Sequence, residues 1–265
     1  MQRYKMNDTY ALVTGSSSGI GLEIARLLAL RGYSLLLVSN EAEKLLLLKT
    51  EFEMNYQVKV ATLYLDLSYH HAAQEVFNYC QQETIEVEVL VNNAGFFFFG
   101  EVTSVDIYQA KQKIQLHVLT TSLLCTLFGN EMKKRRKGFI LNNSSIAAYK
   151  AFPGIAYYGA TKAYISSFTR SLRTELRYYD VWVTCLCPGA TATNLYDPHV
   201  INVDLGKKLG IMMSAEKVAK LGVEGLFRNK AVVIPGLVTR LLLFFSLITP
   251  QWVIYAIRKR TKFLK

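Results

Sequence analysis

The sequence is short of the residues that mark several classes of protein. Its 265 residues include four cysteines, four histidines and five prolines. The histidines show no metal-ligand spacing, and no internal repeat or low-complexity linker divides the chain. The two neighbouring cysteines, Cys185 and Cys187, would share one face of a strand at a spacing too tight for an easy disulfide. We therefore expect one domain with reduced thiols, as in a cytoplasmic protein.

Charge is also scarce, and it is unbalanced. Charged residues make up 19% of the chain and hydrophobic residues 51%, which predicts a folded domain with a sizeable core. The net charge of +11 is concentrated in two basic clusters, Lys133–Lys137 and Arg258–Lys265. Such clusters bind nucleic acid or an anionic membrane surface, or are simply solvated. No nucleic-acid module accompanies them, so we expect no nucleic-acid partner. The first residues, Met1–Asp8, contain no apolar signal segment.

Apolar runs alternate with helical patterns along the chain. The run Ser34–Ser39 shows no polar alternation, as in a strand covered on both faces. Strands alternating with helices predict right-handed crossovers and an α/β fold, a doubly wound parallel sheet with helices on both faces. Strands are predicted at Ala11–Thr14, Ser34–Ser39, Val58–Leu65, Val87–Val91, Gly138–Asn143, Val181–Cys187 and Ala231–Ile234. Helices are predicted at Ile20–Arg31, Glu41–Asn55, Ser68–Glu83, Val105–Met132, Tyr157–Tyr178 and Ala215–Phe227.

The last part of the chain differs in character from the rest. We expect the main domain to span 1–236 and a C-terminal apolar and basic helical extension to span 237–265. A membrane-spanning helix needs about 20 predominantly apolar residues, and Arg240 and Pro250 interrupt this stretch. Leu237–Ile248 and Gln251–Ile257 instead predict short helices, which would lie in a bilayer interface, form a lid or contact another subunit.

The segment Thr14–Gly21 joins an apolar strand to a helix with the spacing Gly-x-x-x-Gly-x-Gly. Such a turn lets the backbone approach a pyrophosphate, and the helix N-terminus supplies free N–H groups and partial positive charge. Alternatively, Gly19 and Gly21 serve only helix–strand packing. The predicted pyrophosphate site comprises Gly15, Ser16, Ser17, Ser18, Gly19, Ile20 and Gly21.

Two other strand ends bear on the rest of a dinucleotide. Asp66 and Leu67 follow the third strand, where a carboxylate can accept from an adenine amino group or cap the next helix. Ser39 and Asn40 follow the second strand. A carboxylate at that point would bind a ribose 2′-hydroxyl, and an arginine would bind a 2′-phosphate. Because neither residue is a carboxylate that repels phosphate, the sequence favours NADP(H) over NAD(H).

Tyr158 and Lys162 occupy positions i and i+4 of a predicted helix and so share a face. Free tyrosine has a pKa of about 10, too high for a good base near neutrality, and a nearby cation lowers that pKa. With Ser145 donating a hydrogen bond to a substrate oxygen, these groups can move a proton to or from a carbinol oxygen. Taken alone, this Tyr and Lys would be an ordinary surface pair. Together with the glycine-rich turn, they indicate hydride transfer.

The ordered set of motifs resembles the short-chain dehydrogenase/reductase family. The resemblance implies a Rossmann-type fold and an NAD(P)(H)-dependent oxidoreductase of carbonyls or secondary alcohols. It also implies that Lys162 reaches the ribose hydroxyls and that Thr193 holds the nicotinamide carboxamide. The matching segments run from about residue 8 to 235 and are Thr14–Gly21, Asp66, Asn92-Asn93-Ala94-Gly95, Ser145, Tyr158-x-x-x-Lys162 and Pro188-Gly189-x-x-x-Thr193.

The resemblance also bears on Asn93 and His117. Asn93, followed by Ala94 and Gly95, is expected near the adenosine ribose, unless it only forms a turn. His117 takes the place of a family asparagine that works mainly through its backbone carbonyl, which holds a water in a proton relay from the lysine. That role can survive with histidine, so we include His117 in the catalytic set. The alternative is a catalytically weak or inactive nucleotide-binding regulatory protein.

Aromatic residues gather where the substrate would enter. Phe96–Phe99 follow Gly95 directly, and Tyr149, Phe152 and Tyr196 add to a predicted apolar substrate wall, although core packing is the alternative for some of these rings. We therefore expect an apolar ketone, such as a ketoacyl chain or a ketosteroid. The family resemblance further implies a homodimer or homotetramer formed through the two long helices.

Overall fold

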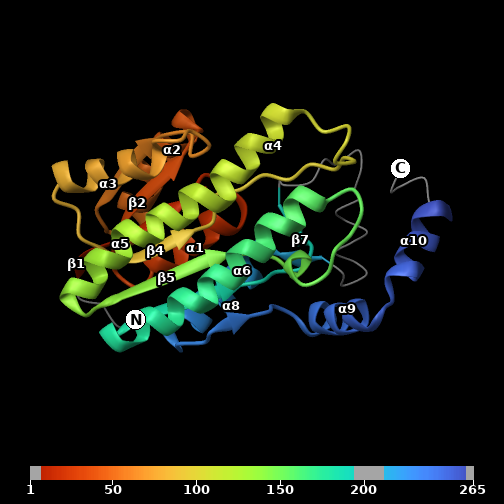
Figure 1. The fold of residues 1–265 in the computed structure, drawn as a ribbon. Helices are drawn as coiled ribbons and strands as arrows, with labels where there is room; N and C mark the ends of the chain where they lie inside the picture. Colours follow the sequence, from red (N-terminus) through yellow and green to blue (C-terminus); the bar gives the residue numbers. More distant parts are fainter. Residues whose placement is uncertain (1–6, 194–211, 261–265) are drawn as a thin grey trace.

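The computed structural model describes residues 7–193 and 212–260, so Tyr196, His199 and the end of the basic tail lie outside the described residues. Seven strands form one parallel sheet in the order β3-β2-β1-β4-β5-β6-β9 (Figure 1). The chain order reverses direction between β1 and β4, which is where ligands bind in such sheets. The predicted doubly wound α/β fold is therefore confirmed.

The strands of the main sheet are β1 (Asn7–Thr14), β2 (Tyr33–Ser39), β3 (Val60–Tyr64), β4 (Val87–Asn92), β5 (Gly138–Asn143), β6 (Val181–Leu186) and β9 (Val232–Val233). A separate pair is formed by β7 (Thr191–Ala192) and β8 (Met213–Ser214). The helices are α1 (Gly19–Ala29), α2 (Ala42–Tyr56), α3 (Ala72–Gln82), α4 (Ile107–Ile114), α5 (Thr121–Arg135), α6 (Ala156–Leu176), α8 (Ala215–Phe227), α9 (Leu237–Ile248) and α10 (Gln251–Arg260).

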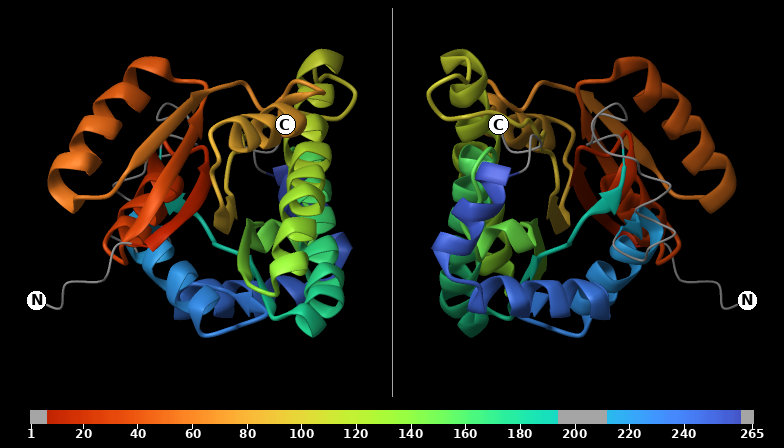
Figure 2. Two further views of the ribbon diagram at one scale, coloured as in Figure 1. Left: turned by 90° about the vertical axis from the view of Figure 1, so that its left-hand side faces the viewer. Right: turned by 90° about the vertical axis from the view of Figure 1, so that its right-hand side faces the viewer.

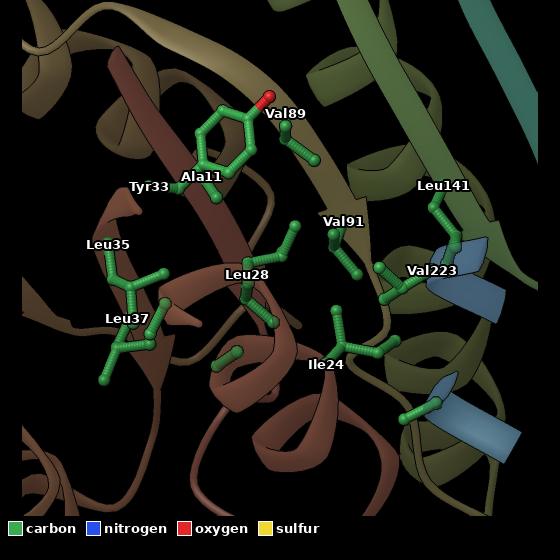
Figure 3. Packing of buried hydrophobic residues seen from close by; sticks show 14 of the residues in the cluster. Ala11, Ile24, Leu28, Tyr33, Leu35, Leu37, Val89, Val91, Leu141 and Val223 are labelled. Carbon is green, nitrogen blue, oxygen red and sulfur yellow. The ribbon is translucent and has the colours of Figure 1, made fainter. Parts of the chain in front are cut away.

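Helices cover both faces of the sheet (Figure 2), and a hydrophobic core lies on each face. Successive residues of a strand point to opposite faces, so Leu35 and Leu37 join one core while Leu36 joins the other. Figure 3 shows the first core, where Ile24 and Leu28 of α1 pack against the strands. Covering both faces explains why the predicted strands read as unbroken apolar runs.

The predicted single helix over Val105–Met132 is interrupted. α4 ends at Ile114, and a π-helical segment, η1 (Gln115–Thr120), joins it to α5. π-helical turns often occur at functional sites, and this one carries His117 on its buried face. The sequence pattern missed the interruption because apolar spacing barely changes across a single turn of altered winding.

The C-terminal extension forms the two predicted helices, α9 and α10, at one end of the molecule (Figure 1). α9 has the predicted bounds, and α10 runs on to Arg260. Within residues 7–193 and 212–260, none of the helices has the length and apolarity required to cross a bilayer.

Candidate active site

A cleft of about 710 Å³ lies at the carboxyl ends of the strands. The glycine-rich turn forms one part of it, and the predicted catalytic residues of α6 form another. Nearly all predicted site residues line this cleft: Gly15, Ser17, Ser18, Gly19, Ile20, Ser39, Asn40, Asp66, Leu67, Asn93, Ala94, Gly95, His117, Ser145, Tyr158, Lys162, Pro188, Gly189 and Thr193. Ser16 and Gly21 do not line it, and Ser16 is fully buried beneath it.

The glycine-rich turn depends on backbone that other residues rarely adopt. Gly15 and Gly19 have φ angles of +62° and +57°, in the left-handed region that favours glycine. A Cβ on Gly21 would lie 2.1 Å from the carbonyl oxygen of Gly15, so this glycine permits close packing beneath the turn. The Ser18 side chain makes no capping hydrogen bond to α1. The N–H groups of the first helical turn therefore remain suited to a dinucleotide pyrophosphate.

Asn93 holds the turn in place. Its Nδ2 donates to the carbonyl oxygens of Thr14 and Gly15, each at 3.1 Å, and its Oδ1 accepts from Asn143 at 2.9 Å. The side chain is thus committed to protein partners, which favours the turn-forming interpretation, although Asn93 also lines the cleft.

At the end of β2, the cleft contains a carboxylate that the sequence reasoning missed. Glu41 lines the cleft beside Ser39 and Asn40. Its carboxylate accepts from the Ser17 hydroxyl at 2.5 Å and from Lys44 at 2.5 Å. The Lys44 ammonium and, to a smaller extent, the Ser17 hydroxyl lower the pKa of Glu41. The sequence signal was present, because Glu41 follows the second strand by only two residues.

Asp66 makes a side-chain hydrogen bond in the turn before α3 and also faces the cleft, but it does not cap that helix, which begins at Ala72 with His71 as its N-cap. Its Oδ1 accepts from the Ser68 N–H at 2.8 Å, while the residue lines the cleft next to Leu67. Its second carboxylate oxygen leaves capacity to accept from a ligand amino group. The capping alternative is therefore wrong, and acceptance from an adenine amino group stays a prediction.

The predicted acid–base residues come together on α6. Lys162 is 4% exposed, and its Nζ lies 5.7 Å from the centroid of the Tyr158 ring. The ammonium donates to the carbonyl oxygen of Asn143 at 2.8 Å. Burial lowers the pKa of Lys162 to about 8. The positive end of this side chain therefore lies close to the phenol, as i, i+4 spacing requires.

Ser145 caps the short turn that follows β5. Its Oγ accepts from the Ala147 N–H at 3.1 Å and donates to the Pro188 carbonyl oxygen at 3.5 Å. The second of these bonds is long, so a substrate oxygen can compete for the hydroxyl proton. Ser145 and Tyr158 line the same cleft, which is the arrangement a carbonyl substrate needs.

His117 is buried with both ring nitrogens bonded within the protein. Nε2 accepts from the Phe96 N–H at 3.3 Å, and Nδ1 lies 2.9 Å from Thr161 Oγ1. Because the Thr161 hydroxyl donates to the Tyr158 carbonyl oxygen at 2.9 Å, the consistent tautomer is neutral with the proton on Nδ1. Burial, followed by the charges of Lys162 and Lys113, holds the pKa of His117 well below 6.5. The side chain therefore links the loop that carries Phe96 to α6.

The predicted apolar wall is only partly assembled. Phe96, Phe97 and Phe98 line the cleft, and Phe97 meets the Tyr158 ring edge-to-face at 5.0 Å between centroids. Tyr149 points elsewhere, with its hydroxyl bonded to Arg170 at 2.8 Å. Phe152 is not among the residues that line the cleft, and Tyr196 lies outside the described residues. Sequence reasoning missed the contribution of α4 and η1, which add Gln109, Gln112 and Leu116.

All four cysteines are buried with free thiols, as predicted. Across the described ranges, no group of three or more His, Cys, Asp or Glu side chains is arranged to hold a metal ion.

The sequence and the fold agree with known proteins. Residues 9–203 match the family model for short chain dehydrogenases. The chain therefore belongs to the short-chain dehydrogenase/reductase family, whose members are oxidoreductases of alcohol and ketone groups that use NAD(P).

Individual relatives are distant. The chain is 30% identical over 190 residues to a diacetyl reductase from Staphylococcus epidermidis, covering 71% of this chain and 73% of that protein. It is 31% identical over 184 residues to a very-long-chain 3-oxoacyl-CoA reductase from Pyrenophora tritici-repentis, covering 67% of this chain but only 53% of that protein. A short-chain dehydrogenase from Sphingobium yanoikuyae solved with NADPH has a TM-score of 0.80 at 24% identity and covers 96% of both chains.

Proposed function

We propose that this protein transfers hydride between a nicotinamide cofactor and an apolar ketone or the matching secondary alcohol. One observation carries the proposal: Tyr158, Lys162 and Ser145 meet in one cleft with the glycine-rich turn. The reduced nicotinamide, when bound, supplies the hydride to the carbonyl carbon. Ser145 donates a hydrogen bond to the carbonyl oxygen, and Tyr158 gives that oxygen a proton. Lys162 favours the resulting phenolate.

The second candidate is a nucleotide-binding regulatory protein with little or no turnover, because His117 replaces the family asparagine. A panel of ketones and alcohols, followed by the absorbance of reduced nicotinamide with both cofactors, separates the two. For the enzyme, Tyr158→Phe lowers kcat/KM at least about 100-fold while cofactor affinity is retained. Tyr164→Phe on the exposed side of the same helix is the matched control. Cofactor binding without turnover across the panel would favour the regulatory protein.

The apolar substrate class rests on the rings of Phe96, Phe97 and Phe98 at the cleft. Relatives named as a 3-oxoacyl-CoA reductase and a hydroxysteroid dehydrogenase-like protein fit a ketoacyl or ketosteroid substrate. We expect kcat/KM to rise with the length of a 3-ketoacyl chain and to be low for keto sugars. Equal turnover of apolar and polar ketones would remove this part of the proposal.

NADP(H) is proposed as the preferred cofactor. Ser39 and Asn40 are uncharged, and the Glu41 carboxylate, which would repel a 2′-phosphate, is offset by Lys44 and Ser17. The ratio of the dissociation constants for NADPH and NADH tests this preference. Glu41→Gln is expected to shift that ratio further towards NADPH, because it removes the negative charge. Tighter binding of NADH by the wild-type protein would reverse the assignment.

A homodimer or homotetramer is proposed to form through α4, η1, α5 and α6, which lie side by side (Figures 1 and 2). These elements expose six large apolar side chains: Ile107, Tyr108, Ile114, Leu119, Leu123 and Tyr164. Burying such a face against a second copy is favourable. Light scattering should give a multiple of the 30.0 kDa chain mass, and the double substitution Leu119→Glu with Leu123→Glu should reduce it. A wild-type monomer would contradict the assembly.

Peripheral contact with an anionic bilayer is proposed for α9 and α10. Thr239 and Leu243 of α9 are buried, whereas most of the other side chains of this helix are exposed. The exposed apolar residues of the two helices are Leu237, Val238, Leu241, Leu242, Phe244, Phe245, Leu247, Ile248, Trp252 and Tyr255. The basic cluster Arg258–Lys265 begins within the last turn of α10. An apolar helix with adjacent cations is suited to an anionic interface.

Flotation with vesicles tests that contact. The full chain is expected to float with phosphatidylserine-containing vesicles and less with phosphatidylcholine alone. Leu242→Glu with Phe245→Glu should abolish flotation, while Leu47→Glu, at a more exposed position on α2, should not. If all variants floated to the same extent as the wild-type protein, the proposed membrane contact would be wrong. The free thiols of the chain support a reducing compartment, so a cytoplasmic location with such a membrane contact is proposed.

A further inference from the structure

Lys113 is fully buried on the inner face of α4. Its Nζ lies 3.4 Å from the centroid of the Phe98 ring and 5.1 Å from that of Phe96. Among the described residues, this nitrogen has no hydrogen-bond partner. Contacts with aromatic faces replace only part of the hydration that an ammonium loses on burial. Burial of the Lys113 amine therefore destabilises the fold, and a functional role explains why a lysine occupies this position.

Two amino groups flank the ring of Tyr158. Lys113 Nζ, from α4, lies 5.6 Å from the ring centroid, and Lys162 Nζ, from α6, lies 5.7 Å from it. Among the described residues, the titratable groups that face Lys113 are Tyr158 and Lys162 on α6 and His117 on η1. The loop before α4 contributes the phenylalanine rings. Burial, followed by the charge of Lys162, lowers the pKa of Lys113 to about 7.

We propose that Lys113 is a positioning residue of the active site, a second ammonium group that acts with Lys162 on the phenol of Tyr158. This inference rests on the proposed function, in which Tyr158 moves the proton. A positive charge beside the phenol favours phenolate, the form that accepts a proton from an alcohol. His117 cannot supply that charge because it is neutral. Since Lys113 loses its own proton near neutrality, its effect is greatest below about pH 7 and fades above it.

The first test does not depend on turnover. The pKa of Tyr158 is read from the ¹³Cζ resonance of tyrosine-labelled protein, assigned by its loss in Tyr158→Phe. Lys113→Arg keeps a charge at every pH, and Lys113→Met never carries one. The pKa of Tyr158 is expected to be about one unit lower in Lys113→Arg than in Lys113→Met. Equal values in the two variants would overturn the proposal, whether or not the protein turns over any ketone.

The second test uses alcohol oxidation and needs only the methionine variant. The ratio of wild-type to Lys113→Met kcat/KM is expected to be about tenfold at pH 6 and to approach one at pH 9. A purely structural role for Lys113 would give a ratio that does not change with pH, and that result would overturn the proposal. Lys111→Met removes a charge from the exposed side of the same helix and is expected to leave the profile unchanged.

Discussion

Lys162 Nζ donates to the main-chain carbonyl oxygen of Asn143 at 2.8 Å. This bond fixes the ammonium at the end of β5, between the sheet and the ring of Tyr158. The family resemblance assigned Lys162 to the ribose, and the observed bond leaves two of its three donors for that task. The position of the charge is thus set by the sheet and not by the ligand.

Replacing Lys162 with methionine should remove the charge while keeping the length of the side chain. We expect kcat/KM for the preferred ketone to fall by a factor of about 100 to 10,000, because the phenol returns towards its ordinary pKa. Steady-state kinetics measures the loss, and circular dichroism checks that the fold is kept. Wild-type turnover in a folded Lys162→Met protein would show that the lysine is not needed.

Gly21 tests the close packing under the dinucleotide turn. A Cβ added there would lie 2.1 Å from the Gly15 carbonyl oxygen and 2.4 Å from Asn93 Nδ2. Gly21→Ala should therefore displace the turn, weaken cofactor binding at least tenfold and cost about 1–3 kcal/mol of unfolding free energy.

Gly129→Ala on α5 is the matched control for Gly21→Ala. Its Cβ would lie 3.5 Å from Leu176 Cδ1, an ordinary van der Waals contact. The change should stabilise the helix by up to about 1 kcal/mol without altering cofactor affinity. Calorimetry and cofactor titration measure both effects, and equal losses in the two variants would remove the special role of Gly21.

The sequence was sufficient for most of the fold because both faces of the sheet are covered. The apolar run at β2 and the bounds of α8 and α9 follow from hydrophobic spacing that tertiary packing reinforces. The sequence also predicted that the site residues lie together, because the carboxyl ends of parallel strands lie at one edge of the sheet. This prediction does not depend on side-chain positions. Glu41 was missed because its role depends on a hydrogen bond to Ser17 across a turn.

Lys113 shows the limit of pattern reading most clearly. Ala110, Lys113, His117 and Thr120 form the buried stripe of α4 and η1, and the spacing alone places Lys113 on that stripe. A lysine is nevertheless read as exposed by default. Only the packed rings of Phe96 and Phe98 reveal that the amine is enclosed.

His117 should make stability depend on pH below neutrality. Its folded-state pKa lies well below 6.5, so the unfolded chain binds a proton that the folded protein does not. Stability is therefore fully present above about pH 6.5 and is lost as pH falls, by up to about 1.4 kcal/mol per pH unit. Urea unfolding between pH 5 and 8 should show that His117→Asn lacks this part of the slope. The exposed His70→Asn is expected to keep it.

Lys113→Met should raise stability while it lowers oxidation activity at low pH. The pKa of Lys113 is about 7 in the fold and about 10.4 in an unfolded chain. Above the pKa of the unfolded state, the Lys113 amine does not lower the free energy of unfolding. As pH falls, its destabilising effect grows, and it levels off below about pH 7. The gain in unfolding free energy on replacing Lys113 should therefore increase from pH 10 to pH 7 by a few kcal/mol, about 1.4 kcal/mol per unit. Urea unfolding at both pH values measures it, with Lys111→Met as the exposed control. If the gain in unfolding free energy were equal at the two pH values, the Lys113 amine would have an ordinary pKa. The positive charge of Lys113 beside Tyr158 would then persist through neutral pH.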